Sequence, residues 1–323
     1  MNMVFIVENA TSASGLPGAG RAVSPAFALL AAAALSAGLG ACGTATSAST
    51  TGAHRGTVDV VAAENFWGSI AAQIGGRDAR VTSMITSPNA DPHLYETDAR
   101  DAAAVARAQV VIENGIGYDS FMSNLLAGSP NAGRTVVDVQ SVLGIHGTNA
   151  NPHVWYDLPR IPEVARAIES ALAGADPAGD ALFAQNLVAF DASLAPIESV
   201  LSTIRAKYAG APVAYTERVP AYLLGDAGLR DVTPAGYALA IEDGVEPSAS
   251  DTHAMDALVS ARRIKVLVYN EQTVSSETDR LRALAAAAGV PVVGVTETMP
   301  ASDNTYQQWQ LAQSRALLTA LGG

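Results

Sequence analysis

From residue 57 onward, short apolar runs alternate with longer amphipathic segments, and this alternation limits the folds that the chain can adopt. Residues 58–62, 81–85 and 110–112 have the length and apolar content of buried strands. The segments between them repeat apolar residues at the three- and four-residue spacing of a helix. This order of strand and helix predicts an α/β fold in which a mainly parallel sheet is flanked by helices.

Residues 160–207 interrupt the alternation. Apart from residues 174–179 they have helical spacing throughout. Pro196 is expected to bend this segment, because proline lacks the backbone N–H that a helix uses. The alternation then resumes over residues 213–295. We therefore expect two lobes, each with its own mainly parallel sheet, joined by a long spine helix.

The first 42 residues have the pattern of an exported lipoprotein. Residues 26–39 form an apolar run of signal-peptide length, and Arg21 precedes them. The chain has one cysteine, Cys42, and it follows Leu39-Gly40-Ala41, which resembles a bacterial lipobox. In this interpretation residues 1–41 are a signal peptide and Cys42 is the site of lipidation.

Two alternatives to this N-terminal interpretation stay open. One is a plain secretory signal with an incidental Cys42, and the other is a translation start further into the chain, since the first 20 residues are nearly uncharged. Residues 42–56 are rich in Gly, Ser, Thr and Ala, which is the composition of a flexible tether. We divide the remainder into an N-terminal lobe (57–158), linking helices (159–209) and a C-terminal lobe (210–323).

The net charge of the 323-residue chain is -12, with a pI of about 4.8. Nucleic-acid-binding domains carry the opposite charge, so we expect no nucleic-acid partner. No stretch after residue 42 has the apolar composition expected of a membrane span. With the lipid on Cys42, the protein is expected at the cell membrane, anchored on its extracytoplasmic face.

Two tripeptides of one shape, Asp91-Pro92-His93 and Asn151-Pro152-His153, each place a histidine behind a proline. Proline fixes its own φ and favours an extended conformation in the residue before it, so each histidine is presented by a stiff loop. Imidazole is the commonest metal ligand among side chains. The pair predicts two metal ligands, although either tripeptide alone is also a common turn.

The flanking residues extend these motifs to Asp91-Pro92-His93-Leu94-Tyr95-Glu96 and Asn151-Pro152-His153-Val154-Trp155. Together they resemble the metal-binding lipoproteins of bacterial zinc and manganese ABC importers, the helical-backbone class of solute-binding proteins. The resemblance covers nearly all of the chain from residue 58 onward, including the spine helix and the lipobox. It implies a metal site between two lobes, with His93 and His153 contributed by the first lobe.

The resemblance also implies two ligands from the second lobe. Glu217, after the strand at residues 213–216, matches the carboxylate variant of the third ligand; without the resemblance it would be interpreted as a helix cap. Glu297 matches the position of the fourth ligand, which is usually an aspartate in this family. Asp303 is the alternative for that position. Trp155 and Tyr95 are expected to wall the site.

Two imidazoles and two carboxylates suit a divalent transition metal. Carboxylates that bind through both oxygens favour harder cations and open the site to five or six contacts. Glu217, and the absence of a His-rich loop before the second motif, favour manganese as the transported ligand, with zinc or iron as alternatives. His146 and His253 are expected to be exposed.

We therefore expect a monomeric solute-binding protein, and no enzyme, that delivers the metal to the permease of an ABC transporter. The alternative from another class is a secreted metal-dependent hydrolase, which would need an open metal position and a nearby base. The sequence contains no His-Glu-x-x-His helix to support that alternative. An adhesin role for the same fold is a further alternative.

Overall fold

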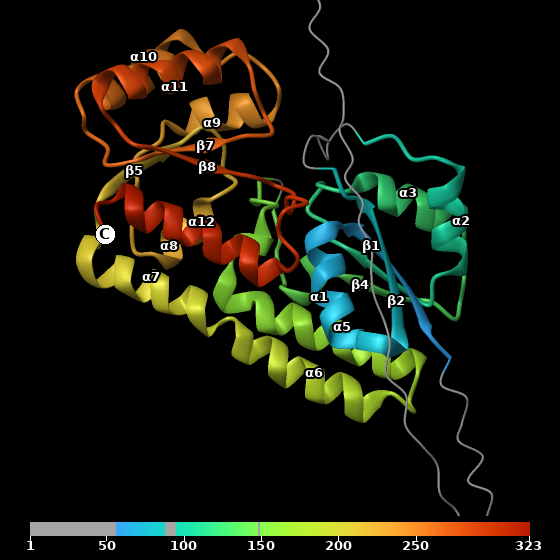
Figure 1. The fold of residues 1–323 in the computed structure, drawn as a ribbon. Helices are drawn as coiled ribbons and strands as arrows, with labels where there is room; N and C mark the ends of the chain where they lie inside the picture. Colours follow the sequence, from blue (N-terminus) through green and yellow to red (C-terminus); the bar gives the residue numbers. More distant parts are fainter. Residues whose placement is uncertain (1–55, 88–94, 148) are drawn as a thin grey trace, which may run out of the picture. The chain divides into compact units, whose positions relative to one another are not determined.

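Two four-stranded parallel sheets organise the molecule, as the ribbon of the computed structural model shows (Figure 1). The structure describes residues 56–87, 95–147 and 149–323. The strands of the first sheet are β1 (Val58–Glu64), β2 (Ala79–Ile85), β3 (Val110–Glu113) and β4 (Thr135–Asp138). Those of the second are β5 (Pro212–Tyr215), β6 (Arg230–Asp231), β7 (Leu267–Asn270) and β8 (Val292–Val295). The predicted α/β class is confirmed.

Both sheets have the same strand order, β2-β1-β3-β4 in the first and β6-β5-β7-β8 in the second. All their pairings are parallel. In each sheet the chain reverses its direction of winding between the two central strands, β1 and β3 or β5 and β7. Ligands of open α/β sheets bind outside the carboxyl ends of strands at such switch points. The loops that follow these four strands are therefore the places to look for a site.

Helices cover both faces of each sheet. In the N-terminal part these are α1 (Asn65–Gly75), α2 (Ala99–Arg107), α3 (Ser120–Gly128), α4 (Val139–Val142) and α5 (Ile161–Ala175). In the C-terminal part they are α8 (Ala221–Asp226), α9 (Ala235–Glu242), α10 (Ala249–Ser260), α11 (Ser276–Ala288) and α12 (Tyr306–Ala320). Short 3-10 turns lie at Gly76–Asp78, Val154–Tyr156 and Leu158–Arg160.

The period-two pattern of β1 explains how one strand serves two cores. Val60 and Ala62 pack in the cluster that includes α1 and α5, whereas Val61 and Ala63 pack on the other face with α2 and α3. Successive strand residues point to opposite faces, so a strand buried on both sides is apolar throughout. This is why residues 60–63 form a continuous apolar run.

The spine helix consists of α6 (Asp180–Ser193) and α7 (Ala195–Tyr208), which run on from one another below both sheets (Figure 1). The join lies at Leu194, and Pro196 occupies the first turn of α7. Proline is tolerated there because the first N–H groups of a helical segment need no partner within it. The predicted spine and its bend are confirmed.

By length and composition alone, the helix from Asp180 to Tyr208 could cross a membrane, with a mean hydropathy of 1.4 over its most apolar window. This corrects the expectation that no stretch after residue 42 has such a composition. The signal is weak, since helices in the cores of soluble proteins meet the same criterion. Here α6 packs on α1 and α5, and α7 packs on α12.

One apolar cluster runs through both halves of the molecule. It joins strand residues of the two sheets to aromatic side chains between them, including Phe66, Trp155 and Trp309. The Phe66 ring stacks on that of Trp155 with centroids 4.3 Å apart. Residues 51–323 accordingly form one compact unit. The finer boundaries at 57, 159 and 210 stay predictions.

Capping side chains set where several helices begin. Helix α2 begins at Ala99, because Asp98 caps it and forms a reciprocal capping box with Asp101. The last helix begins at Tyr306, with Thr305 as its cap. Strand β6 was not expected, because two residues carry no periodic signal. The signal peptide, Cys42 and nearly all of the tether lie outside the described residues.

Candidate metal centre

His153 is fully buried, and its imidazole is held in one tautomer by Asn151. The Asn151 side-chain Nδ2 donates to the backbone carbonyl of Arg218 at 2.9 Å, so its Oδ1 must be the acceptor toward His153. That oxygen accepts from the His153 backbone N–H at 3.1 Å and lies 2.6 Å from the imidazole Nδ1. The proton therefore lies on Nδ1, and Nε2 presents a lone pair.

The free lone pair of His153 faces a carboxylate. Its Nε2 lies 3.6 Å from Glu297 Oε2 and has no hydrogen-bond partner among the described residues. Two lone pairs at this distance repel each other unless a proton or a cation lies between them. Ligand atoms at about 2.0–2.1 Å from a tetrahedral zinc ion lie roughly 3.3–3.4 Å apart, so the observed gap is of the right size for a shared ion.

Tyr118 reaches the same carboxylate from the loop after β3. Its hydroxyl donates to Glu297 Oε2 at 2.9 Å. Gly115, Ile116 and Gly117 all have positive φ, with Ile116 at 56°, which carries strain for a β-branched residue. The Asp119 carboxylate secures the loop by accepting the backbone N–H groups of Asn114 and Gly115 at 2.6 and 2.8 Å. The strained loop thus places a phenol opposite the second sheet.

Glu217 lies two residues beyond the end of β5 and is 3% exposed. It does not cap a helix, because α8 begins only at Ala221 and no side chain caps it. Instead, Glu217 Oε2 accepts from the Asn270 amide at 2.6 Å. Its other oxygen, Oε1, has no hydrogen-bond partner among the described residues. The helix-cap interpretation of Glu217 is therefore wrong.

Glu297 lies two residues beyond β8 and is 2% exposed. The side chain of Gln272 holds its backbone, since Gln272 Oε1 accepts from the N–H groups of Glu297 and Thr298 at 2.5 and 2.8 Å. The Glu297 carboxylate divides its contacts, with Oε1 bound to Asn270 at 2.7 Å and Oε2 bound to Tyr118. Its longer side chain thus reaches a position between the two sheets.

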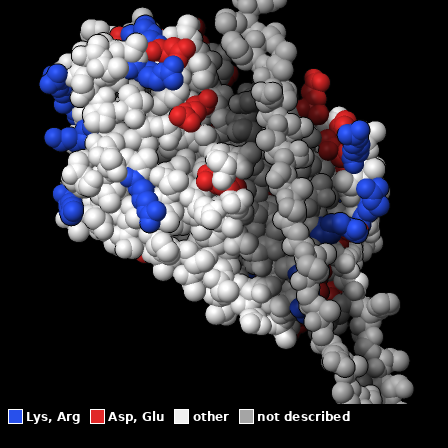
Figure 2. Space-filling model, in the orientation of Figure 1, with Lys and Arg blue, Asp and Glu red and all other residues white. Residues whose placement is uncertain are grey.

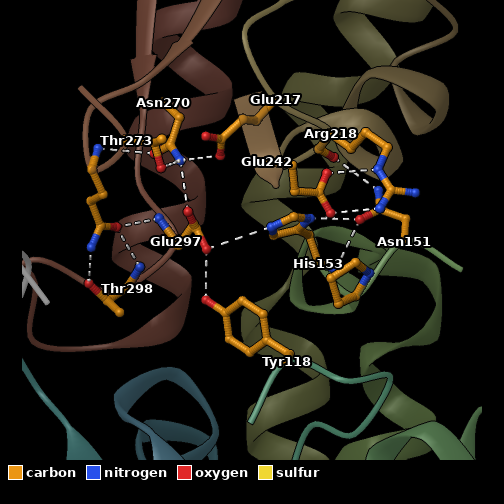
Figure 3. A network of polar contacts seen from close by, with 12 residues as sticks. Tyr118, Asn151, His153, Glu217, Arg218, Glu242, Asn270, Thr273, Glu297 and Thr298 are labelled. Carbon is orange, nitrogen blue, oxygen red and sulfur yellow. Dashed lines mark hydrogen bonds and ion pairs between the residues drawn. The ribbon is translucent and has the colours of Figure 1, made fainter. Parts of the chain in front are cut away.

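Figure 3 shows His153, Glu217 and Glu297 pointing toward a common region, with Asn270 beside the two carboxylates. The Asn270 amide nitrogen donates to both of them. No three His, Cys, Asp or Glu side chains of the described ranges are gathered closely enough to form a metal site as they stand. In this trio an amide nitrogen bridges the two carboxylates.

The two glutamates share a buried, acidic environment. Burial, and next the charge of Glu297, raise the pKa of Glu217 to about 8, while the hydrogen bond from Asn270 acts in the opposite direction. Burial is also the main cause of the raised pKa of the Tyr118 phenol, followed by the charge of Glu297. A divalent cation would remove the repulsion between the two carboxylates.

Of the two aromatic residues expected to wall the site, Trp155 and Tyr95, only Trp155 lies against His153 in the described contacts. Trp155 is fully buried, and its ring meets that of His153 edge-on with centroids 5.2 Å apart, as expected of a residue that orients the imidazole. Tyr95 is directed elsewhere, because its hydroxyl donates to Asp101 at 2.9 Å and its ring packs on Phe121. The expectation that Tyr95 walls the site is therefore not met by its described contacts.

Polar contacts join the two halves of the molecule next to Glu297. The Asn65 amide, at the start of α1, donates to the Met299 carbonyl at 2.7 Å and accepts the Met299 N–H at 3.0 Å. One turn and two turns further along α1, Ser69 and Gln73 bond to Tyr306 and Gln307. This α1 ladder fixes the segment that follows Glu297.

Of the four predicted ligands, the structure brings His153, Glu217 and Glu297 together. His93 lies outside the described residues, as do Asp91 and Pro92. Asp303 lies in the turn before α12, where its backbone N–H donates to the Pro300 carbonyl at 3.0 Å. His146 and His253 are exposed, as expected.

Sequence reasoning missed Asn270, Tyr118 and Gln272. A usable signal existed for Asn270, since it is the polar last residue of an otherwise apolar strand beside a switch point. The same reasoning identifies Glu64, the last residue of β1, which is fully buried. Tyr118 has a weaker signal, a phenol in a Gly-rich loop directly after a strand.

The fold defines the class of protein. The structure of a periplasmic zinc-binding protein, TroA from Treponema pallidum, aligns with a TM-score of 0.70 over 82% of this chain and 99% of that one, at 19% identity. This chain therefore shares the fold of that protein, two sheets joined by a spine helix. The model of the ZnuA family, described as zinc-uptake complex component A, periplasmic, matches residues 60–320, and the chain belongs to this family.

Two relatives match over part of their length. A putative metal-binding protein of Treponema pallidum is 25% identical over 200 residues, which cover 55% of this chain and 61% of the relative. The manganese-binding lipoprotein MntA of Halalkalibacterium halodurans is 26% identical over 176 residues, or 53% of this chain and 56% of the relative. The matched part spans little more than half of either relative. The resemblance indicated by the two histidine motifs is confirmed at the level of the family.

Proposed function

We propose that this protein is an extracytoplasmic solute-binding protein that captures a divalent transition metal between its two sheets and delivers it to an ABC permease. The observation that supports this most directly is the lone pair of His153 Nε2 facing a carboxylate oxygen of Glu297 at 3.6 Å. A buried imidazole and carboxylate in this arrangement need a cation or a proton between them. Family membership supplies the transport context.

The proposed ligands are His93, His153, Glu217 and Glu297. His153 Nε2 and Glu217 Oε1 support the assignment, because each is buried and has no hydrogen-bond partner among the described residues. The proposed third ligand atom is Glu297 Oε2, which accepts a hydrogen bond from the Tyr118 hydroxyl. His93 is included among the proposed ligands on the basis of its sequence motif alone.

The burial of the three described ligands bears on how an ion would enter. His153, Glu217 and Glu297 are 0–3% exposed, so the α1 ladder or a neighbouring loop must shift before a cation can reach them. The continuous apolar cluster between the sheets restricts such movement to a small one. This geometry suits a carrier that releases its cargo only when a partner separates the lobes. It does not suit an enzyme, which needs access for substrate.

The metal itself is proposed as manganese, zinc or iron. The relatives include proteins named for manganese and for zinc, so family membership does not choose between these metals. Zinc binds most sites of this kind more tightly than manganese does in vitro, whichever metal is carried in the cell.

The membrane location rests on Cys42. A lipid on this cysteine would hold the metal-binding part at the extracytoplasmic face of the cell membrane, close to the permease, as a monomer on its tether. Cys42→Ser is expected to release the protein from the membrane fraction without changing its metal affinity. Retention of the variant in washed membranes would contradict the lipid anchor.

Elemental analysis tests the metal cargo. The full chain, purified from its source cells grown with manganese, zinc and iron supplied together, is expected to contain one of these metals at about one ion per chain. The His153→Ala variant should contain almost none. Equal metal content in the two proteins would contradict the proposed site.

A further inference from the structure

The Asn270 side chain has an unusual position, because one amide group serves two acidic side chains. Its Nδ2 donates to Glu217 Oε2 at 2.6 Å and to Glu297 Oε1 at 2.7 Å (Figure 3). It also lies 3.1 Å from Thr273 Oγ1. Hydrogen bonds to carboxylates are shorter and stronger than bonds between neutral groups. The amide thus ties down one particular oxygen of each glutamate.

The orientation of this amide is fixed from the other side. Asn270 Oδ1 accepts the backbone N–H of Gln272 at 3.1 Å, which requires that Nδ2 face the carboxylates. The backbone N–H of Asn270 is itself held by Thr216 Oγ1 at 3.0 Å. Asn270 is 1% exposed and ends the central strand β7. Because the Asn270 amide is held in this way, we expect it to keep its orientation when a metal ion binds.

We propose that Asn270 is a specificity-determining residue, which restricts Glu217 and Glu297 to one metal-binding oxygen each and so favours a four-coordinate ion of the zinc type. This inference rests on the proposed function. With Glu217 Oε2 and Glu297 Oε1 bound to the amide, the other oxygens are Glu217 Oε1, which has no hydrogen-bond partner among the described residues, and Glu297 Oε2, which accepts from Tyr118 and lies 3.6 Å from His153 Nε2. Together with His153 Nε2 these are three donors, and one further donor would complete a four-coordinate site.

Zinc and manganese differ in the coordination number that they prefer. Zinc in protein sites takes four ligands in tetrahedral geometry, whereas manganese prefers more oxygen ligands and an octahedral arrangement. A carboxylate that binds through both oxygens raises the coordination number by one. Asn270 opposes this in both glutamates at once. The structure therefore argues against the sequence-based preference for manganese, which assumed that the carboxylates could bind through both oxygens.

The charged groups beside Glu217 also support the role proposed for Asn270. Glu242, whose charge acts on Glu217, is engaged by Arg218 through two bonds of 2.7 and 2.6 Å. This pairing disfavours Glu242 as an additional oxygen ligand that would offset the restriction imposed by Asn270.

Cobalt(II) substitution tests the proposal, because four-coordinate Co²⁺ absorbs strongly in the visible region and six-coordinate Co²⁺ absorbs weakly. The full wild-type chain loaded with Co²⁺ is expected to give the strong spectrum. Asn270→Ala should give a weaker spectrum, and its affinity for Mn²⁺ relative to Zn²⁺ should rise about tenfold or more. Asn186→Ala is the matched control, since it removes an amide bond of 2.8 Å to Ile74 far from the carboxylates and should change neither quantity.

The outcomes of these experiments distinguish the role of Asn270 from the proposed function itself. A weak, six-coordinate spectrum of wild-type protein would overturn the role of Asn270, even if the variant failed to fold. So would an Asn270→Ala variant that loses affinity for Zn²⁺ and Mn²⁺ by the same factor with an unchanged Co²⁺ spectrum. If wild-type protein bound none of these ions, the proposed function itself would fail, and the inference with it.

Discussion

Glu64 ends β1 and Glu217 follows β5, which are corresponding strands of two sheets with the same order, yet the two carboxyl groups have different surroundings. Both Glu64 oxygens are buried and have no hydrogen-bond partner among the described residues. Burial, and next the charge of Asp119, raise the pKa of Glu64 well above its usual value. Glu217 is equally buried but receives the Asn270 amide on one oxygen.

This comparison shows that strand order alone does not determine where a metal site can form. The shared strand order brings an acidic residue to each switch point. Only the second sheet supplies a donor that fixes the acid and leaves one lone pair directed toward an imidazole. Burial raises the pKa of both carboxyl groups, but at Glu217 the hydrogen bond from Asn270 acts in the opposite direction, and the Glu64 oxygens receive no such bond among the described residues. We therefore propose the metal site beside Glu217 and not beside Glu64.

The largest effect is expected from His153→Ala. Loss of the hydrogen-bond partners of metal ligands alone costs about 10–100-fold in affinity, so loss of a ligand should cost more than about 100-fold. Calorimetric titration of the full chain with Zn²⁺ measures this. His253→Ala, which removes an exposed histidine on α10, is the control and should bind as wild type does. Unchanged affinity of the His153 variant would remove this histidine from the site.

Glu217→Gln and Glu64→Gln test the comparison between the sheets. The first substitution removes a proposed anionic ligand and should weaken Zn²⁺ binding by about 10–100-fold or more, by analogy with the loss of ligand-supporting groups. The second replaces a carboxyl group that is not among the proposed ligands, so Zn²⁺ affinity should change little. Equal losses in the two variants, measured by the same titration, would show that the sheets do not differ as we argue.

The stability of the metal-free protein should depend on pH in a way that bound metal suppresses. The pKa of Glu217 is about 8 in the folded protein, against 4.5 as its ordinary value. Between these values the folded state holds a proton that the unfolded chain has lost, so the free energy of unfolding falls as pH rises. Burial acts in the same direction on Glu113, whose pKa it raises to about 7.

Thermal unfolding of the metal-free chain at pH 6 and pH 8 measures this dependence. The Tm should be higher at pH 6, and Glu217→Gln should show a smaller difference between the two pH values. With saturating Zn²⁺ the order should reverse, because the metal must compete with the proton at low pH. A metal-free protein that is more stable at pH 8 would contradict the pKa assigned to Glu217.

The smallest effect is expected at the α1 ladder. Asn65→Ala removes two bonds to the backbone of Met299, two residues beyond Glu297, and should weaken Zn²⁺ binding by about tenfold, since each net hydrogen bond contributes about 0.5–1.5 kcal/mol. Gln73→Ala removes bonds to Gln307, further from Glu297. It should lower Tm with little change in affinity. A larger loss of affinity for Gln73→Ala would mean that the ladder does not act through Glu297.

The sequence predicted the sheets, the spine helix and three converging side chains, because each leaves a local signal. Apolar runs mark the buried strands, Pro196 marks the bend, and Asn-Pro-His marks the stiff loop. On the face shown in Figure 2, uncharged side chains predominate among the described residues, and the Lys and Arg side chains lie in separate groups toward its edges.

The parts that the sequence did not predict depend on contacts between distant segments. Asn270 is 53 residues from Glu217 and 27 from Glu297, and nothing in the sequence around it marks the contact. Tyr118 acts across 179 residues. Tyr95 was misplaced because its motif suggests a site residue, while Asp101, six residues on, captures its hydroxyl. Pairing of side chains across the fold is set by the packing of both sheets.

A diffraction experiment on crystals of the full chain grown with Zn²⁺, with data collected at the zinc absorption edge, tests the central claim most directly. We expect one strong anomalous peak within about 2.0–2.2 Å of His153 Nε2, Glu217 Oε1 and Glu297 Oε2, with Asn270 still bound to the other carboxylate oxygens. A peak beside Glu64, or an ion held without His153, would contradict the account.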